Sequence, residues 1–109
     1  MVPERVSYFR RDHLTLEELR QRHRNGILAL AAAHGARNVR VFGSIARGEQ
    51  QQGSDVDLLV DFEPGRSLLA LTGLTLDLER ALNCKVDVVS SRGLRPQVAA
   101  AVLRDAVSI

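Results

Sequence analysis

The sequence V-F-G-S-I-A-R-G-E-Q-Q-Q-G-S-D-V-D-L-L-V, from Val41 to Val60, decides the fold and predicts where a site lies. A short apolar run ends in Gly43-Ser44, and two aspartates, Asp55 and Asp57, open a second apolar run. Side chains alternate faces along an extended strand, so the two aspartates share one face. Their Cα atoms are expected about 7 Å apart, from a rise of about 3.3 Å per residue.

This pairing of carboxylates with a glycine turn predicts a site for a metal ion and a phosphate. Two carboxylates at this spacing repel and shift each other's pKa unless positive charge lies between them. Mg²⁺ is bound by one or two carboxylates together with substrate phosphates. Gly43 allows a sharp turn and a close backbone approach. Ser44 adds a hydroxyl and can open a short helix whose N-terminus attracts phosphate.

The same residues also have purely structural interpretations. Asp55 and Asp57 can cap the turn or pair with Arg40 and Arg47, since surface acids usually stay solvated. Ser44 can be a helix N-cap, a role compatible with phosphate binding. These alternatives are open on the residues alone.

The longer string resembles a known family. Gly43-Ser44, ten further residues and Asp55-Val56-Asp57, followed later by Lys85-Val86-Asp87-Val88-Val89, are similar to the minimal nucleotidyltransferase (MNT) domains of the DNA polymerase beta-like nucleotidyltransferase superfamily. The resemblance runs from about residue 39 to the C-terminus. It implies an α/β fold, a small mixed sheet with packed helices, in which three aspartates cluster at one edge of one face.

The resemblance also implies roles for individual residues. Asp55 and Asp57 would bridge two Mg²⁺ ions, while Asp87 would hold the catalytic metal and accept the proton of the attacking hydroxyl. Gly43 and Ser44 would bind the β- and γ-phosphates of ATP. Arg47 is a candidate for the triphosphate because of its place in the motif and its planar fork of donors. A structural ion-pair role for Arg47 is nevertheless the preferred interpretation.

MNT proteins are commonly encoded beside a HEPN-domain ribonuclease toxin. The resemblance therefore implies an antitoxin that transfers AMP from Mg-ATP to a tyrosine hydroxyl of that toxin. Two alternatives remain: an antitoxin that neutralises its partner by binding alone, and a small-molecule nucleotidyltransferase. The second would need more substrate-binding surface than a chain of 109 residues offers, unless it dimerises.

Composition narrows the class of protein further. A chain of 12.0 kDa predicts one small domain, divided here into an arm, residues 1–14, and a nucleotidyltransferase domain, residues 15–109. No apolar stretch approaches the length of a membrane span, and the N-terminus does not read as a secretory signal. The single cysteine, Cys84, excludes an internal disulfide and fits the cytoplasm.

The charges are unevenly distributed. Residues 1–40 carry eight basic and four acidic residues, whereas residues 41–109 carry seven basic and nine acidic ones. The basic segment would suit a nucleotide or an RNA-associated partner, or it forms a solvated helix face. Nucleic acid is not expected as the direct substrate, because only 4% of residues are aromatic and the arginines are dispersed.

Periodicity predicts the elements between these motifs. Thr15 and Glu18 have the spacing of a capping box, and Gly35 is the expected stop of that helix. Further strands and helices are expected, in chain order, at 38–42, 44–48, 55–62, 68–82, 85–89 and 96–106. Asp61 lies on the face of the catalytic aspartates and is interpreted as a salt-bridge or loop-end residue.

The helix expected at 68–82 is apolar on two sides. Leu69 and Leu76 point almost opposite to the main stripe, with Gly73 between them. A helix of this kind is deeply buried or meets a partner, and in so small a domain a homo- or hetero-oligomeric contact is favoured. The main stripe is expected to consist of Leu68, Leu71, Leu74, Leu78, Ala81 and Leu82.

Overall fold

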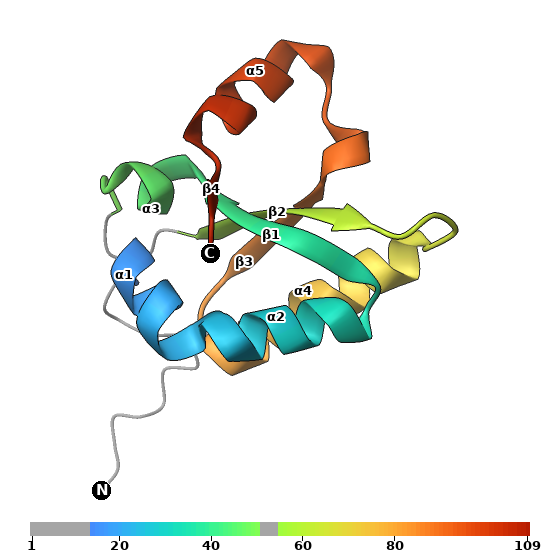
Figure 1. Cartoon of the computed structure of the whole chain (residues 1–109), viewed down its shortest axis with the longest axis horizontal. Coiled ribbons are helices and arrows are strands. Elements are labelled where there is room, and N and C mark those ends of the chain that lie inside the picture. Colours follow the sequence, from blue (N-terminus) through green and yellow to red (C-terminus); the bar gives the residue numbers. More distant parts are fainter. Residues whose placement is uncertain (1–13, 51–54) are drawn as a thin grey trace, which may run out of the picture.

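A mixed four-stranded sheet of order β3-β2-β1-β4 organises the chain in the computed structural model, which describes residues 14–50 and 55–109 (Figure 1). The strands are β1 (Ala36–Phe42), β2 (Val56–Phe62), β3 (Val86–Ser90) and β4 (Val107–Ser108). β1 is antiparallel to β2 and β4, whereas β2 and β3 are parallel and joined through helix α4 (Leu68–Leu82). Parallel strands require such a crossover. The predicted fold class is confirmed.

The first helical region begins as the sequence predicts. The Thr15 hydroxyl accepts a hydrogen bond from Glu18 N at 3.0 Å, and the Glu18 carboxylate accepts one from Thr15 N at 3.1 Å. A π turn at Leu19–His23, which the sequence did not predict, separates α1 (Leu16–Glu18) from α2 (Arg24–Ala33). The chain then turns at Gly35, whose φ is +78°.

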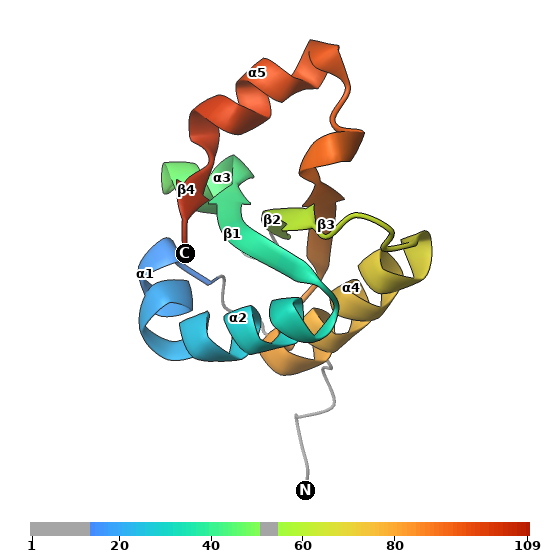
Figure 2. The same ribbon diagram turned by 45° about the vertical axis from the view of Figure 1, so that its right-hand side comes forward.

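The helices form two layers around the sheet. Figures 1 and 2 show α2 and α4 side by side on one face, while α3 (Gly43–Arg47) and α5 (Pro96–Asp105) lie on the other. The main core lies between the sheet and the α2–α4 layer. Leu14, the last residue of the predicted arm, is part of this core, and the rest of that arm lies outside the described residues. The largest fully buried members of this core are Leu19, Ile27, Leu58, Leu74 and Leu78, and Ile45 joins the same cluster from α3.

Helix α4 has the predicted bounds but not the predicted burial. The Ser67 hydroxyl caps it by accepting from Leu69 N at 3.2 Å. Leu68, assigned to the buried stripe, is 73% exposed, because the first turn of α4 borders an open pocket instead of the core. Ala81, also assigned to that stripe, is exposed too. Leu69 and Leu76 point outward as predicted, with exposed fractions of 81% and 48%.

Gly73 lets α4 approach α2 closely. A Cβ at Gly73 would lie 2.8 Å from Cε1 of His34, whose Nε2 lies 2.8 Å from Asp77 Oδ2. His34 therefore has a structural role and joins the end of α2 to α4.

The C-terminal segment crosses the face opposite α2 and α4. Pro96 opens α5 at its first turn, as predicted, and the helix ends at Asp105. The chain then adds β4, which pairs Val107 with Val41 of β1. Two residues are too few for a periodic signal, so the sequence did not reveal this strand. Within residues 14–50 and 55–109, no helix has the length and apolar character to cross a membrane.

Candidate functional site

Strand register brings the predicted site residues together. In the antiparallel β1–β2 pair Phe42 faces Asp57, and in the parallel β2–β3 pair Asp57 faces Asp87. β1 therefore ends, at the Gly43 turn, beside the starts of both β2 and β3. Asp55 lies just before β2 at the same end. The sheet thus collects Gly43 and all three aspartates at one edge, as the sequence predicted.

Gly43 is required here for two physical reasons. Its φ of +78° belongs to the left-handed region that favours glycine. In addition, a Cβ at this position would collide with Oδ2 of Asp57. The turn backbone therefore lies directly against the Asp57 carboxylate.

The short helix α3 starts at Gly43 itself. Phe42 is the residue before it, and no side chain caps its first turn. Ser44 consequently lies inside the first turn, and its interpretation as an N-cap is wrong. The first N–H groups of a helix have no intrahelical acceptor, and the helix dipole adds partial positive charge there. The backbone at Gly43-Ser44 is therefore suited to an anionic group.

The three aspartates interact through their charges. The pKa of Asp57 is raised to about 6, first by burial of its carboxyl group and then by the charges of Asp87 and Asp55. The charge of Arg47 offsets this only in part. Repulsion from the two neighbouring acids thus adds to the effect of burial at Asp57. Such repulsion is relieved by a proton or by a bound cation.

The acids are not drawn together into a ready-made metal cluster. In the described part of the chain, no three His, Cys, Asp or Glu side chains lie close enough together to hold a metal ion by themselves. Mg²⁺ does not need three protein ligands, since it commonly binds one or two carboxylates, several waters and substrate phosphates. The donor atoms that the three aspartates offer are all carboxylate oxygens, and the negative charge of Asp57 is disfavoured by its surroundings. Both features fit a hard divalent cation that binds together with a phosphate substrate.

Arg47 is engaged by two acids. Its Nε donates to Glu49 Oε1 at 2.9 Å, and its Nη1 donates to Asp105 Oδ2 at 2.6 Å. The ion-pair interpretation of Arg47 is therefore confirmed. Asp105 was not identified from the sequence, because it lies 58 residues away and meets α3 only through the course of α5. Its bond joins the end of α5 to the helix that follows Gly43.

Asp61, four residues after Asp57 on the same face, has a different environment. Its carboxylate accepts from Arg40 Nη2 at 2.7 Å and from Asn38 Nδ2 at 2.9 Å. Hydrogen bonding by Ser91, then by Asn38, lowers the pKa of Asp61, with the charge of Arg40 acting in the same direction. Its predicted salt-bridge role is confirmed. Arg40 is thus paired with Asp61, not with Asp55 or Asp57.

The fold and this site define a class of protein. A mixed sheet that brings a glycine turn against one aspartate of an Asp-x-Asp pair, with a third aspartate on the adjacent strand, is the arrangement expected of a nucleotidyltransferase. Residues 15–108 match the nucleotidyltransferase domain family. The chain belongs to this family.

Known proteins of similar sequence and structure agree. Protein adenylyltransferase MntA of Thermococcus cleftensis is 42% identical over 96 residues, which cover 88% of this chain and 97% of the relative. A solved structure described as a "putative minimal nucleotidyltransferase" is 53% identical with a TM-score of 0.77, covering 90% of this chain and 99% of that one. A toxin–antitoxin crystal structure with AMP-PNP is 25% identical with a TM-score of 0.69, covering 79% and 71%.

Proposed function

We propose that this chain is a Mg²⁺-dependent protein adenylyltransferase and the antitoxin of a toxin–antitoxin system in the cytoplasm. It would transfer AMP from ATP to a tyrosine hydroxyl of a cognate HEPN-domain ribonuclease toxin. The observation that carries the proposal is the register that places Asp57 beside Asp87 and against Gly43. The protein adenylyltransferase MntA and the toxin–antitoxin structure with AMP-PNP support the same activity and biological setting.

In this proposal the backbone at Gly43-Ser44 binds the β- and γ-phosphates of ATP. Its uncapped N–H groups supply donors and partial positive charge without a counterion of their own. Arg47, at the other end of α3, would move from Glu49 and Asp105 toward the triphosphate. Fixed donors of this kind act mainly by positioning the phosphates and stabilising their charge.

Asp55 and Asp57 would hold the metal ions, with Asp87 completing the site from β3. Bound Mg²⁺ supplies positive charge that neutralises the phosphates and stabilises the attacking and leaving oxygens. The tyrosine oxygen attacks the α-phosphorus, the bond between that phosphorus and the β-bridging oxygen breaks, and pyrophosphate leaves. The Asp87 carboxylate accepts the tyrosine proton. A bound cation would also offset the burial and the repulsion that together raise the pKa of Asp57.

Intact-mass analysis tests this proposal. The protein encoded beside this chain is incubated with it, Mg²⁺ and ATP, and is expected to gain mass in whole AMP units. Asp55→Asn/Asp57→Asn is the inactive variant. Asp61→Asn is the matched control. It removes a carboxylate from the same face of β2, but this carboxylate already pairs with Arg40. Circular dichroism confirms that each variant is folded.

The other outcomes separate the alternative functions. A tight complex without any mass gain would contradict the enzymatic proposal and favour an antitoxin that acts by binding. Neither complex nor mass gain would favour transfer to a small hydroxylated molecule. Equal mass gains with the wild type and the Asp55→Asn/Asp57→Asn variant would exclude the assigned site.

A further inference from the structure

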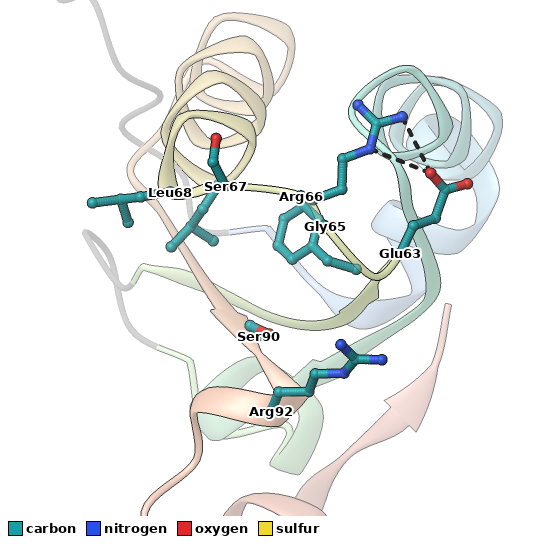
Figure 3. A pocket seen from close by; sticks show the side chains of 9 residues that line it. Glu63, Gly65, Arg66, Ser67, Leu68, Ser90 and Arg92 are labelled. Atoms are coloured by element: carbon teal, nitrogen blue, oxygen red, sulfur yellow. Dashed lines mark hydrogen bonds and ion pairs between the residues drawn. The ribbon is translucent and has the colours of Figure 1, made fainter.

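A pocket of about 320 Å³ lies at the end of β2 and β3 remote from the aspartates. Phe62 at the end of β2 and Leu68 and Leu71 in the first turns of α4 give it a mostly apolar lining. Figure 3 shows Arg66 and Arg92 at different sides of it, with Ser90 between them. Nothing in the proposed transfer chemistry uses this pocket.

Exposed leucines extend the apolar lining onto the surface of α4. Leu68 and its neighbour Leu69 are the most exposed large apolar side chains among the described residues. Leu76 lies seven residues after Leu69, two helical turns along the same side, and is also exposed. A pocket continuous with exposed leucines marks a binding surface, since monomeric proteins rarely leave such patches uncovered.

The charged residues that line the pocket are Glu63, Arg66 and Arg92. Arg66 is held in place by Glu63, at 3.2 Å, and lies so close to Gly35 that a Cβ there would collide with its guanidinium. Arg92 is exposed and forms no ion pair with any residue in 14–50 or 55–109. An unpaired arginine beside an apolar pocket favours an occupant that carries a carboxylate.

Charge also argues against the α5 face of a second copy of this chain as the occupant. The other exposed apolar side chains that the structure describes, Val98 and Leu103, lie on α5 between Arg95 and Arg104. Bringing that helix onto the patch would place arginines against Arg92. Like charges at an interface cost free energy and suppress wrong pairings.

We propose that this docking surface, comprising Phe62, Leu68, Leu69, Leu71, Leu76 and Arg92, binds an acidic segment of the acceptor protein. An apolar side chain of that segment fills the pocket, and an adjacent carboxylate pairs with Arg92. The inference rests on the protein adenylyltransferase function proposed above, and it assigns where the acceptor is held.

Distance explains why such a surface serves a protein acceptor. Five residues of β2 separate Asp57 from Phe62, about 17 Å at a rise of about 3.3 Å per residue, and three residues of β3 separate Asp87 from Ser90, about 10 Å. A folded protein acceptor can contact both ends at once. Binding energy from parts of a substrate remote from the reacting bond can position the reacting group. The docking surface thus supplies contact area that a single small domain otherwise lacks.

The first measurement is the affinity of the purified protein encoded beside this chain, by titration calorimetry. Leu69→Glu/Arg92→Glu places charge in the patch and reverses the rim charge, and its Kd is expected to weaken at least about tenfold. Leu103→Glu/Arg104→Glu is the matched control, because Leu103 is 52% exposed on α5, and its Kd is expected to stay at the wild-type value. Raising NaCl to about 0.5 M should weaken wild-type binding more than binding by Arg92→Glu.

A second readout separates docking from catalysis. A tyrosine tripeptide copied from the modified site spans less than about 11 Å and cannot reach from Asp57 to Phe62. The docking variant should modify this peptide at the wild-type rate while its KM for the whole partner rises and kcat is retained. An unchanged Kd in the docking variant, or no wild-type binding, would overturn the docking proposal. A weakened Kd without any wild-type AMP transfer would keep the docking surface and overturn the proposed function.

Discussion

The two ends of β2 carry aspartates on the same face, yet their surroundings differ in every respect. Asp61 is surrounded by donors from Arg40 and Asn38, and its pKa is lowered. Asp57 lies against the Gly43 turn and beside two more acids, and its pKa is raised to about 6. The comparison shows that the fold supplies hydrogen-bond donors and a counter-charge to Asp61, whereas it buries Asp57 beside other acids.

Asp57→Asn should show the largest effect. AMP transfer is expected to fall at least about a hundredfold, the order found when one charge-stabilising group is lost from an active site. Without Mg²⁺ and nucleotide, however, the variant should be more stable than the wild type at pH 7 by about 1 kcal/mol, after allowance for solvent screening of a half-buried group. Urea unfolding and a transfer assay measure the two quantities.

The direction of the Asp57 pKa shift determines how the stability difference between the wild type and Asp57→Asn changes with pH. The folded-state pKa of Asp57 is above the ordinary carboxyl value, so the folded state binds the proton more tightly. The wild type should therefore match Asp57→Asn below about pH 4 and lose stability relative to it as pH rises through about 6. A wild type that is the more stable of the two at pH 7 would contradict a pKa of Asp57 raised by burial and by the neighbouring acids.

Comparing the AMP-transfer activities of Gly43→Ala and Gly48→Ala tests whether the close approach of the turn to Asp57 matters. Both glycines have positive φ, +78° and +74°, so both substitutions carry a similar backbone cost of about 1–2 kcal/mol. A Cβ at Gly48 meets open space, whereas one at Gly43 collides with the Asp57 carboxylate. Only Gly43→Ala should also lower transfer strongly. Equal activity losses would show that helix α3, not the contact with Asp57, matters.

Asp105→Asn tests the acid that holds Arg47. Removing its charge should leave Arg47 more available to phosphate and tighten binding of a non-hydrolysable ATP analogue by up to about fivefold, since an exposed ion pair is worth no more than about 1 kcal/mol. Arg47→Ala should weaken the same binding. Weaker nucleotide binding by Asp105→Asn, measured by calorimetry, would instead make Asp105 a positioning residue for α3.

Asp61→Asn should show the smallest effect and the opposite pH sign to Asp57→Asn. The pKa of Asp61 is lowered in the folded state, so its charge stabilises the protein above the ordinary carboxyl pKa and that contribution is lost as the group protonates. The variant should be less stable than the wild type at pH 7 by about 0.5 kcal/mol, converging with it in acid. Parallel urea titrations of the two variants provide the direct contrast.

Much of this site could be predicted from the sequence because it depends on local patterns. The alternation of β2 placed Asp55 and Asp57 on one face, and the glycine turn followed from Gly43-Ser44. The role of Asp87 was expected from the family resemblance alone, and the βαβ crossover from β2 through α4 is what brings β3 alongside β2. The first two features need only the period of a strand and the properties of glycine.

The missed features depend on contacts between distant segments. Asp105 reaches Arg47 because α5 crosses over α3, and no local signal announces that crossing. Leu68 continues the apolar stripe of α4 but lies beyond the region that the core covers, so periodicity alone gave the wrong burial. The pocket at the far end of β2 is lined by residues from three separate segments, so no single segment of the sequence predicted it.

Helix α5 has a consequence for how this protein resists heat. None of its side chains is buried, and it is attached through the Arg47–Asp105 bond and through β4 on β1, which is followed by Ile109 in the core. Segments with few buried contacts open at a free energy below that of global unfolding. Such opening would uncover the edge of β1, and an unpaired strand edge is a template for association with another chain. Loss by aggregation through this edge is therefore expected before the core melts.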